Sequence, residues 1–184
     1  MLVGLDEVGR GCWAGPLVAG AVVLGSPIAG LKDSKKLSRA QREKLDAEIR
    51  VSALGFGLGW VSPEELDRVG LTEAVRLAME RALAEVAEVY DEIIIDGNLN
   101  FFSKDPRSRA VIGADNSVPE VSAASIIAKV ARDRYMAEMS VRFPGYGFDK
   151  HVGYGTAAHQ SALETNGLTE LHRRSFKPIQ AFVL

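Results

Sequence analysis

The sequence contains little cysteine, no long apolar run and no large excess of either charge. Cys12 is the only cysteine among 184 residues, so no intrachain disulfide can form and a reducing compartment is expected. The longest apolar run, residues 17–24, is far shorter than the ~20 residues that a membrane span needs. The first residues show neither the basic segment nor the cleavage site of a secretory signal peptide. These absences predict a cytoplasmic protein with no membrane partner.

The composition is that of an ordinary globular protein, with 47% hydrophobic, 25% charged and 7% aromatic residues. Collagen-like, fibrous and broadly disordered chains are therefore excluded. A domain usually takes about 100–200 residues, so the length predicts one domain over residues 1–184.

The net charge of −2 conceals an uneven distribution along the chain. Residues 129–184 carry 8 basic and 5 acidic side chains and all three histidines, whereas residues 1–128 have a net charge of −5. An acidic first part and a basic end are compatible with a metal site beside a phosphate track. On charge alone, ordinary scatter in a soluble protein is the better interpretation.

The hydrophobic pattern predicts a mixed α/β domain built in layers. The segments predicted to be strands are 3–8, 17–24, 54–61, 92–96 and 110–114. The glycines within 54–61 indicate a strand that is bent or closely approached by another element. The predicted helices are 38–50, one that begins at Ser62–Pro63, 71–90, 121–139 and 156–166.

Carboxylates follow three of the predicted strands. Asp6 and Glu7 end the first strand, Asp96 ends the very apolar run 93–95, and Asp115 follows the last strand. If these strand ends converge, the carboxylates would repel each other unless a cation neutralised them, and hard oxygen ligands favour Mg²⁺ or Mn²⁺. The alternative for any one of them is an ordinary turn residue, because aspartate is common where strands stop.

Asp6 and Glu7 are adjacent, so in a regular strand they would point to opposite faces. Either the strand ends or bulges here, which Gly9 would permit, or Glu7 contributes from another direction. Asp6 is therefore the predicted central ligand.

Two segments have the composition of phosphate-binding loops. In Gly9-Arg10-Gly11, the glycines allow backbone amides to approach a ligand and the arginine offers a fork of donors. Lys35 and Lys36 lie beside a predicted helix start, where positive charge and free amides favour phosphate. The alternatives are a tight turn with an exposed arginine and a pair of solvated lysines.

Tyr154 lies between Gly153 and Gly155, which would expose its ring for stacking on a sugar or base. A tyrosine buried in a turn is the alternative interpretation. Cys12 has no histidine nearby in the sequence and is predicted to be a packed thiol, not a nucleophile.

These motifs, in this order, resemble the bacterial ribonuclease HII family, and they cover residues 6–176. The segments that carry the resemblance are Asp6-Glu7-Val8-Gly9-Arg10-Gly11, Asp33-Ser34-Lys35-Lys36-Leu37, Asp96-Gly97-Asn98, Asp115, residues 121–133 (VSAASIIAKVARD), His151-Val152-Gly153-Tyr154-Gly155-Thr156 and His172-Arg173-Arg174-Ser175-Phe176. One departure is Cys12, where the family often has proline after Gly-Arg-Gly.

The resemblance implies a ribonuclease H-like fold, with a mixed five-stranded sheet flanked by helices and a helical C-terminal portion. Residues 1–184 would form a single catalytic domain in which residues 140–184 contact the substrate. The implied activity is that of an endonuclease that cuts the RNA strand of RNA–DNA hybrids. It would also cut 5′ of single ribonucleotides in duplex DNA and leave 3′-hydroxyl and 5′-phosphate ends.

The same resemblance assigns roles to individual residues. The catalytic and metal-binding acids would be Asp6, Glu7, Asp96 and Asp115. They would hold two divalent ions, Mg²⁺ or Mn²⁺, one to activate water and the other to stabilise the leaving 3′-oxygen. Gly9, Arg10 and Gly11 would sense the ribose 2′-hydroxyl, Tyr154 would stack on the next deoxyribose, and Lys35 and Lys36 would bind substrate phosphates. No obligate protein partner is expected, and the protein is predicted to be a monomer.

Two other classes compete with this hypothesis. A different nuclease or an integrase with the same fold would also have acids at strand ends, but it would not need Arg10 and Tyr154 framed by glycines. A hybrid-binding module without catalysis would keep the basic end but would have no use for four acids. The fold alone does not separate these classes.

Overall fold

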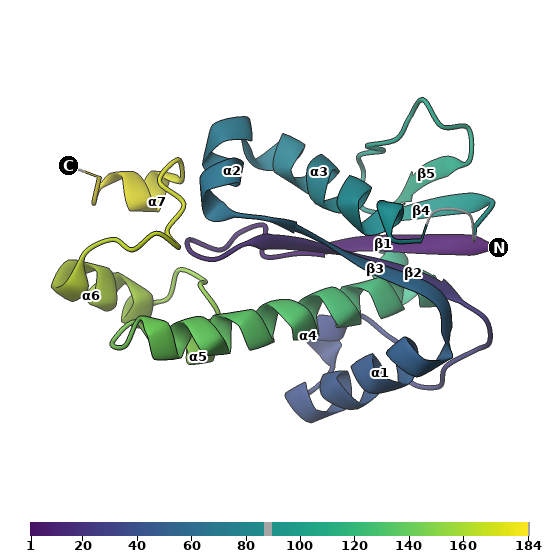
Figure 1. Ribbon diagram of the computed structural model, residues 1–184, viewed down its shortest axis with the longest axis horizontal. Helices are drawn as coiled ribbons and strands as arrows, with labels where there is room; N and C mark the ends of the chain where they lie inside the picture. The colour runs from purple at the N-terminus through teal and green to yellow at the C-terminus, as the bar shows by residue number, and fades with distance from the viewer. Residues whose placement is uncertain (87–89, 184) are drawn as a thin grey trace.

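A five-stranded sheet with helices on both faces forms the centre of the computed structural model, which describes residues 1–86 and 90–183 (Figure 1). The strands are β1 (Leu2–Val8), β2 (Leu17–Leu24), β3 (Ala53–Val61), β4 (Glu92–Asp96) and β5 (Ser108–Val111). Their order in the sheet is β3-β2-β1-β4-β5, with β1, β2 and β3 antiparallel and β4 and β5 parallel to β1. The predicted mixed five-stranded sheet is confirmed.

The alternation of side chains along the strands divides the core between two layers. Val3 and Leu5 of β1 pack towards α2 (Pro63–Val69) and α3 (Leu71–Ala84). The opposite face of the sheet packs against α4 (Pro119–Arg142), which in turn contacts α1 (Arg39–Ser52). Figure 1 shows the sheet between these two helical layers.

Two glycines allow the helices to lie directly on the sheet. A Cβ atom at Gly59 of β3 would come within 1.8 Å of the Ala78 carbonyl oxygen in α3. One at Gly20 of β2 would come within 2.4 Å of the Ala124 carbonyl oxygen in α4. The close approach predicted for β3 is therefore confirmed, and α4 also lies directly against the sheet on the other face.

Three of the predicted helix starts are confirmed by side-chain hydrogen bonds. Ser38 and Gln41 form a reciprocal capping box at the start of α1. Ser62 accepts from the Glu65 amide ahead of α2, and Thr156 accepts from the His159 amide ahead of α6 (Ala157–Asn166). These caps satisfy amides that have no partner within the helix.

The predicted boundaries of three elements were wrong. The last strand, expected at 110–114, ends at Val111 because Gly113 takes a left-handed conformation (φ 70°). The chain then turns into a short 3₁₀ helix, η2 (Ala114–Asn116). The helix expected at 71–90 ends at Ala84, and residues 87–89 of that prediction lie outside the described residues. The helix expected at 121–139 extends over 119–142.

The C-terminal region forms a separate small core at the end of α4, far from the N-terminus in Figure 1. It contains α5 (Phe148–His151), α6 and α7 (Lys177–Gln180). The sequence patterns did not predict α5, α7 or the 3₁₀ helix η1 (Ser34–Lys36), all of which have three or four residues. Among the described residues, no helix is both long enough and apolar enough to cross a membrane.

Candidate metal centre and active site

The carboxylates of Asp6, Asp96 and Asp115 meet at one edge of the sheet. β1 and β4 are parallel neighbours with Leu5 opposite Ile95, so Asp6 and Asp96 lie side by side at the ends of the two strands. Asp115 reaches the same point from η2. One carboxylate oxygen from each of the three lies within 4.8 Å of the others. The expected convergence of the strand ends therefore occurs for these three acids.

Burial raises the pKa of two of these acids. Asp6 is 6% exposed, and burial raises the pKa of its carboxyl well above the usual range, with further increases from the charges of Glu7 and Asp96. Burial also raises the pKa of Asp115, and the charge of Asp96 adds to the effect. Each shift shows that the ionised form is held at a cost in this environment.

Hydrogen bonds fix the orientation of the carboxylates. The Ser125 hydroxyl in α4 interacts with Asp6 and lies 2.8 Å from the Ser34 hydroxyl in η1. The Asn116 side-chain amide donates to the Asp115 carboxylate at 2.7 Å, and the Ser122 hydroxyl donates to the main-chain carbonyl of Asp115 at 2.7 Å. The triad is thus held from α4 and from η2.

The donor set fits a divalent cation. Three acidic side chains offer hard oxygen ligands within a short distance, and their mutual repulsion is removed when a cation binds. Such a site suits Mg²⁺ or Mn²⁺ better than a soft metal, because it contains neither thiolate nor imidazole.

Glu7 lies beside the triad and not within it. Its side chain lines the same pocket as Asp6, and its Oε1 atom accepts from Arg10 at 3.4 Å. Burial raises the pKa of the Glu7 carboxyl, whereas the Arg10 guanidinium opposes that shift. Glu7 is therefore placed to approach a bound cation or its water from a direction different from that of Asp6.

A pocket of about 240 Å³ lies beside Asp6, Glu7 and Asp96 and brings together most of the predicted site, although Asp115 does not line it. Its lining residues are Asp6, Glu7, Val8, Gly9, Arg10, Gly11, Ser34, Lys35, Asp96, Ser125, Lys129 and Tyr154. Lys36 is not among them, and its ammonium group instead donates to Asn116 next to Asp115. The sequence patterns had not singled out Ser34, Ser125 or Lys129. The i, i+4 spacing of Ser125 and Lys129 on a helix was the available signal.

Two buried arginines support the Gly-Arg-Gly loop from below. Arg173 donates to the Arg10 carbonyl at 3.2 Å and twice to the Gly15 carbonyl, at 3.0 and 2.9 Å. Arg132 donates to the carbonyls of Ala14 and Pro16 at 3.0 and 2.8 Å. Both are fully buried, and burial lowers the pKa of Arg173 to about 10. These contacts hold residues 10–16 against the C-terminal region.

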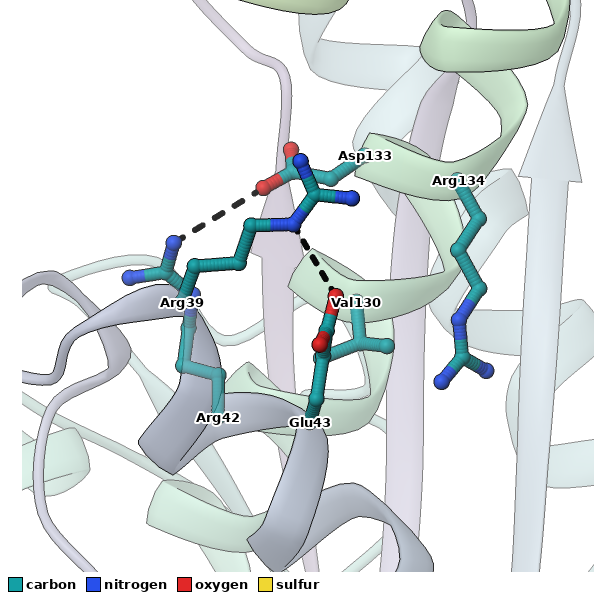
Figure 2. Close-up of a pocket in the computed structure, with 6 residues that line it drawn as sticks. All are labelled: Arg39, Arg42, Glu43, Val130, Asp133 and Arg134. Atoms are coloured by element: carbon teal, nitrogen blue, oxygen red, sulfur yellow. Dashed lines mark hydrogen bonds and ion pairs between the residues drawn. The ribbon is translucent and has the colours of Figure 1, made fainter.

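A third arginine supports the lysine turn. Arg42 of α1 donates to the carbonyls of Ser34 and Leu37, at 3.0 and 2.6 Å, and so fixes the turn that carries Lys35. Figure 2 shows Arg42 reaching Asp133 of α4, 3.9 Å away, across a small pocket between the two helices. Asp133 also holds Lys129 at 2.8 Å. Asp133 thus connects Arg42, which supports the lysine turn, to Lys129, whose side chain lines the acid pocket.

The mixed sheet with clustered acids at the ends of β1 and β4 is the arrangement expected of a ribonuclease H-like nuclease. The family model described as Ribonuclease HII matches residues 3–179, so the chain belongs to the ribonuclease HII family. The chain is a ribonuclease H hydrolase that acts on RNA–DNA hybrids.

Relatives support this assignment over nearly their whole length. A Ribonuclease HII from Halorhodospira halophila is 48% identical over 181 residues, which are 97% of this chain and 93% of that protein. A Ribonuclease HII from Thermosynechococcus vestitus is 47% identical and covers 95% of this chain and 83% of its own length.

Solved structures agree with the fold. The ribonuclease H2 from Pyrococcus horikoshii OT3 has a TM-score of 0.80 and 26% identity, covering 98% of this chain and 96% of that one. The RNase HII from Archaeoglobus fulgidus, solved in a PCNA complex, has a TM-score of 0.83 and 29% identity, covering 96% and 95%.

Proposed function

We propose that this ribonuclease cuts both continuous RNA–DNA hybrids and the 5′ side of single ribonucleotides embedded in duplex DNA. The products would carry 3′-hydroxyl and 5′-phosphate ends. The observation that carries the proposal is that Asp6, Asp96, the Gly9–Gly11 loop and Tyr154 line one pocket, and that Asp115 lies within 4.8 Å of the two aspartates. A nuclease that cuts only continuous hybrids would not need Tyr154 to recognise the deoxyribose that follows a single ribonucleotide.

The proposed metal ligands are Asp6, Asp96 and Asp115, with Glu7 beside them. Asp6 is the proposed shared ligand, because it lies at the centre of the strand ends and the charges of both Glu7 and Asp96 act on it. Two bound Mg²⁺ or Mn²⁺ ions would supply an activated water and charge stabilisation at the leaving 3′-oxygen. The pairing of β1 with β4 holds Asp6 beside Asp96. Arg10, Lys35 and Lys129 line the same pocket and are available to bind substrate phosphates.

The Gly-Arg-Gly loop is the proposed reader of the ribose 2′-hydroxyl. Gly9 has a positive φ of 89°, and a Cβ atom there would lie 2.4 Å from the Arg132 side chain. Gly11 has open space around it, so its backbone is accessible to a ligand. Because the 2′-hydroxyl can both donate and accept, exposed backbone groups are suitable partners for it.

Tyr154 is the proposed platform for the sugar that follows the ribonucleotide. Its side chain is 39% exposed, lines the acid pocket and lies 5.9 Å, ring centroid to Nζ, from Lys129. An aromatic face beside a cation suits a sugar next to a phosphate. Residues 140–184, which include Tyr154, are accordingly proposed as the substrate-contacting part of the domain.

The protein is proposed to act in the cytoplasm as a monomer without an obligate protein partner. The Archaeoglobus fulgidus relative was solved with PCNA, and that contact is a property of the relative. Sedimentation of the pure protein, alone and with a sliding clamp, tests this expectation.

The deciding experiment uses three duplexes of one sequence: all DNA, DNA with one ribonucleotide, and DNA paired with RNA. Each is incubated with Mg²⁺, with Mn²⁺ or with EDTA, and the ends are mapped at single-nucleotide resolution. We expect cleavage of the second and third duplexes with either metal, and a cut 5′ of the single ribonucleotide that leaves a 5′-phosphate. Cleavage of the hybrid alone would reject the proposed junction specificity, while cleavage of the all-DNA duplex would reject the 2′-hydroxyl sensor.

A further inference from the structure

All three histidines of the chain lie together behind the loop that carries Tyr154. His151, His159 and His172 are 9%, 0% and 2% exposed. The rings of His151 and His159 are stacked with centroids 4.5 Å apart, and the rings of His159 and His172 lie 5.3 Å apart. The proposed function uses none of them, although the chain has no other imidazoles.

The hydrogen bonds of this cluster run in one direction towards Tyr154. The Thr169 amide donates to Nδ1 of His172 at 2.9 Å, so a neutral His172 ring carries its proton on Nε2. That Nε2 atom lies 3.1 Å from Nε2 of His159, which must then accept. His159 is left with a proton on Nδ1, which lies 2.9 Å from the Tyr154 carbonyl oxygen. Each tautomer is thus fixed by the bond before it.

His151 holds the other side of the same loop. Its Nδ1 atom accepts from the Gly153 amide at 3.2 Å, and its Nε2 atom lies 2.7 Å from the Tyr146 carbonyl oxygen. The carbonyl of His151 in turn accepts from the Tyr154 amide at 2.9 Å. With both the amide and the carbonyl of Tyr154 bonded, the direction of its Cα–Cβ bond is fixed.

The loop needs this support because its backbone is strained. Val152 has φ 44° and ψ 36°, and within residues 1–86 and 90–183 it is the only residue other than glycine with a positive φ. A β-branched residue rarely takes this conformation, and it persists only where its surroundings hold it. Arg132 donates to the Val152 carbonyl at 2.7 Å, and the Trp13 amide donates to the Gly153 carbonyl at 2.8 Å.

We propose that His172 and His159 are positioning residues, which set the Tyr154 main chain and thereby aim its ring at the acid pocket. This inference rests on the proposed role of Tyr154 at the sugar beyond the ribonucleotide. Neither histidine lines the pocket with the acids, so they act through Tyr154 and do not contact the reacting atoms. Small misplacement of a substrate contact is enough to slow the chemical step.

The test replaces each histidine with phenylalanine, which keeps a buried ring but removes the hydrogen bonds. His159→Phe and His172→Phe should lower the single-turnover rate on a single-ribonucleotide duplex by about tenfold, with the duplex Kd changed by less than about threefold. In a Tyr154→Ala background the same substitutions should have almost no further effect, because the contact they position is already gone. Equal losses in both backgrounds would overturn the proposal.

Tyr146→Phe is the matched control for a merely structural effect. Tyr146 packs against His172 with ring centroids 5.6 Å apart, and its hydroxyl donates to the Gly167 carbonyl at 2.8 Å. Its backbone carbonyl, which His151 uses, remains in the variant. Tyr146→Phe should lower the melting temperature while keeping the rate within about twofold of the unmodified protein. A rate loss equal to that of His172→Phe would identify the cluster as ordinary core.

A measurement on the unmodified protein keeps the proposal testable if the variants do not fold. Nitrogen-15 spectra at pH 7 should show the Nε2–H tautomer for His172 and the Nδ1–H tautomer for His159. The opposite tautomer in either ring would overturn the proposal.

Amide exchange separates this proposal from the proposed role of Tyr154. If Tyr154→Ala leaves the rate unchanged, the sugar contact is wrong, and exchange at the Gly153 and Tyr154 amides then decides the positioning claim. Faster exchange in His172→Phe than in Tyr146→Phe would support the coupling, and equal exchange would reject it.

Discussion

At the scale of the residue, the burial and mutual repulsion of the three carboxylates in the acid triad destabilise the folded protein. Asp6 is buried beside two other carboxylates, and burial raises its pKa before any neighbouring charge is counted. The carboxylate accepts from the Glu7 amide at 2.8 Å and interacts with the Ser125 hydroxyl, and neither of these partners is charged. A buried charge without a cationic partner persists in a fold when its function requires it.

Replacing Asp6 should therefore separate activity from stability. Asp6→Asn removes a charged ligand but keeps the shape, so cleavage should fall by at least about 10³-fold, since metal catalysis supplies several kcal/mol. The melting temperature in EDTA should stay the same or rise, because a like-charge repulsion is removed. Single-turnover assays with saturating Mg²⁺ and Mn²⁺, together with calorimetry, measure both effects.

Asp46→Asn is the matched control for that experiment. Asp46 is 1% exposed but is paired with Arg50 at 2.9 Å and Arg134 at 3.4 Å, outside the acid pocket. Its replacement should lower the melting temperature and leave the rate unchanged. Near-normal activity of Asp6→Asn would remove Asp6 from the role of central ligand.

Tyr154→Ala should slow cleavage at a single ribonucleotide much more than it weakens duplex binding. A lost stacking contact costs about 1–3 kcal/mol where it is used, which corresponds to about a 5- to 150-fold loss of rate. Binding is spread over phosphate contacts and should change little. Melting temperature, Kd and single-turnover rate are to be measured on the same variant. A uniform fall in all three would mean that Tyr154 serves only the packing of its loop.

At the scale of the element, the C-terminal segment between α6 and α7 should make stability depend on pH. Burial and the neighbouring His159 lower the pKa of His172 to about 4, against an ordinary value of 6.5. Between these values the unfolded chain binds the proton and the folded chain does not. The free energy of unfolding should therefore fall, by up to about 3 kcal/mol, as the pH drops from 6.5 towards 4.

The pH prediction is isolated by comparing the protein with His172→Phe. Asp6, Glu7 and Asp115 have raised pKa values and therefore contribute in the opposite direction over part of this range. Other titratable groups around His172 are His151, His159, Tyr146, Glu64, Asp67, Glu170 and Arg174. Denaturant midpoints at several pH values should show a smaller acid loss in the variant. Parallel curves for the two proteins would refute the assignment to His172.

Local sequence signals predicted some boundaries of the helices and strands and missed others. Ser38 with Gln41 and Ser62 with Pro63 marked helix starts correctly, because a cap depends on residues that are close together in the sequence. The proximity of Asp6 and Asp96 was also predictable, because each follows an apolar run that had to be a buried strand, and the ends of such strands can meet at one edge of the sheet. The end of β5 was missed because Gly113 gave no sign of whether it continued the strand or turned it.

The support behind the site could not be read from the sequence in the same way. Arg132 and Arg173 look like surface residues in a basic segment, yet both are buried and bind main-chain carbonyls more than a hundred positions away. The strained conformation of Val152 likewise depends on partners that only the fold brings together. Long-range contacts of this kind have no local pattern.

At the scale of the whole molecule, the burial of Arg132 and Arg173 lowers the number of cations that the surface can offer to nucleic acid. Residues 129–184 carry a net charge of +3, but two of their eight cations are internal. Three more are paired: Lys129 with Asp133 and Arg142 with Glu170, each at 2.8 Å, and Arg134 with Asp46 at 3.4 Å. The surface that can bind phosphate is therefore smaller than the sequence suggests, and Arg10 and Lys35 at the acid pocket carry more of it.

Binding of an RNA–DNA hybrid should accordingly weaken with salt, but only moderately. Each neutralised phosphate contributes a slope of about −0.9 in log affinity against log salt, so three or four contacts predict a slope near −3. Asp6→Asn protein in EDTA allows binding to be measured without cleavage. Lys35→Ala should reduce the slope by about 1, whereas Lys104→Ala, which lies by a different pocket lined by Phe101 and Phe102, should leave it unchanged. A flat dependence would show that this face does not hold the backbone, and a slope that both variants change equally would show that the cations act only through the net charge.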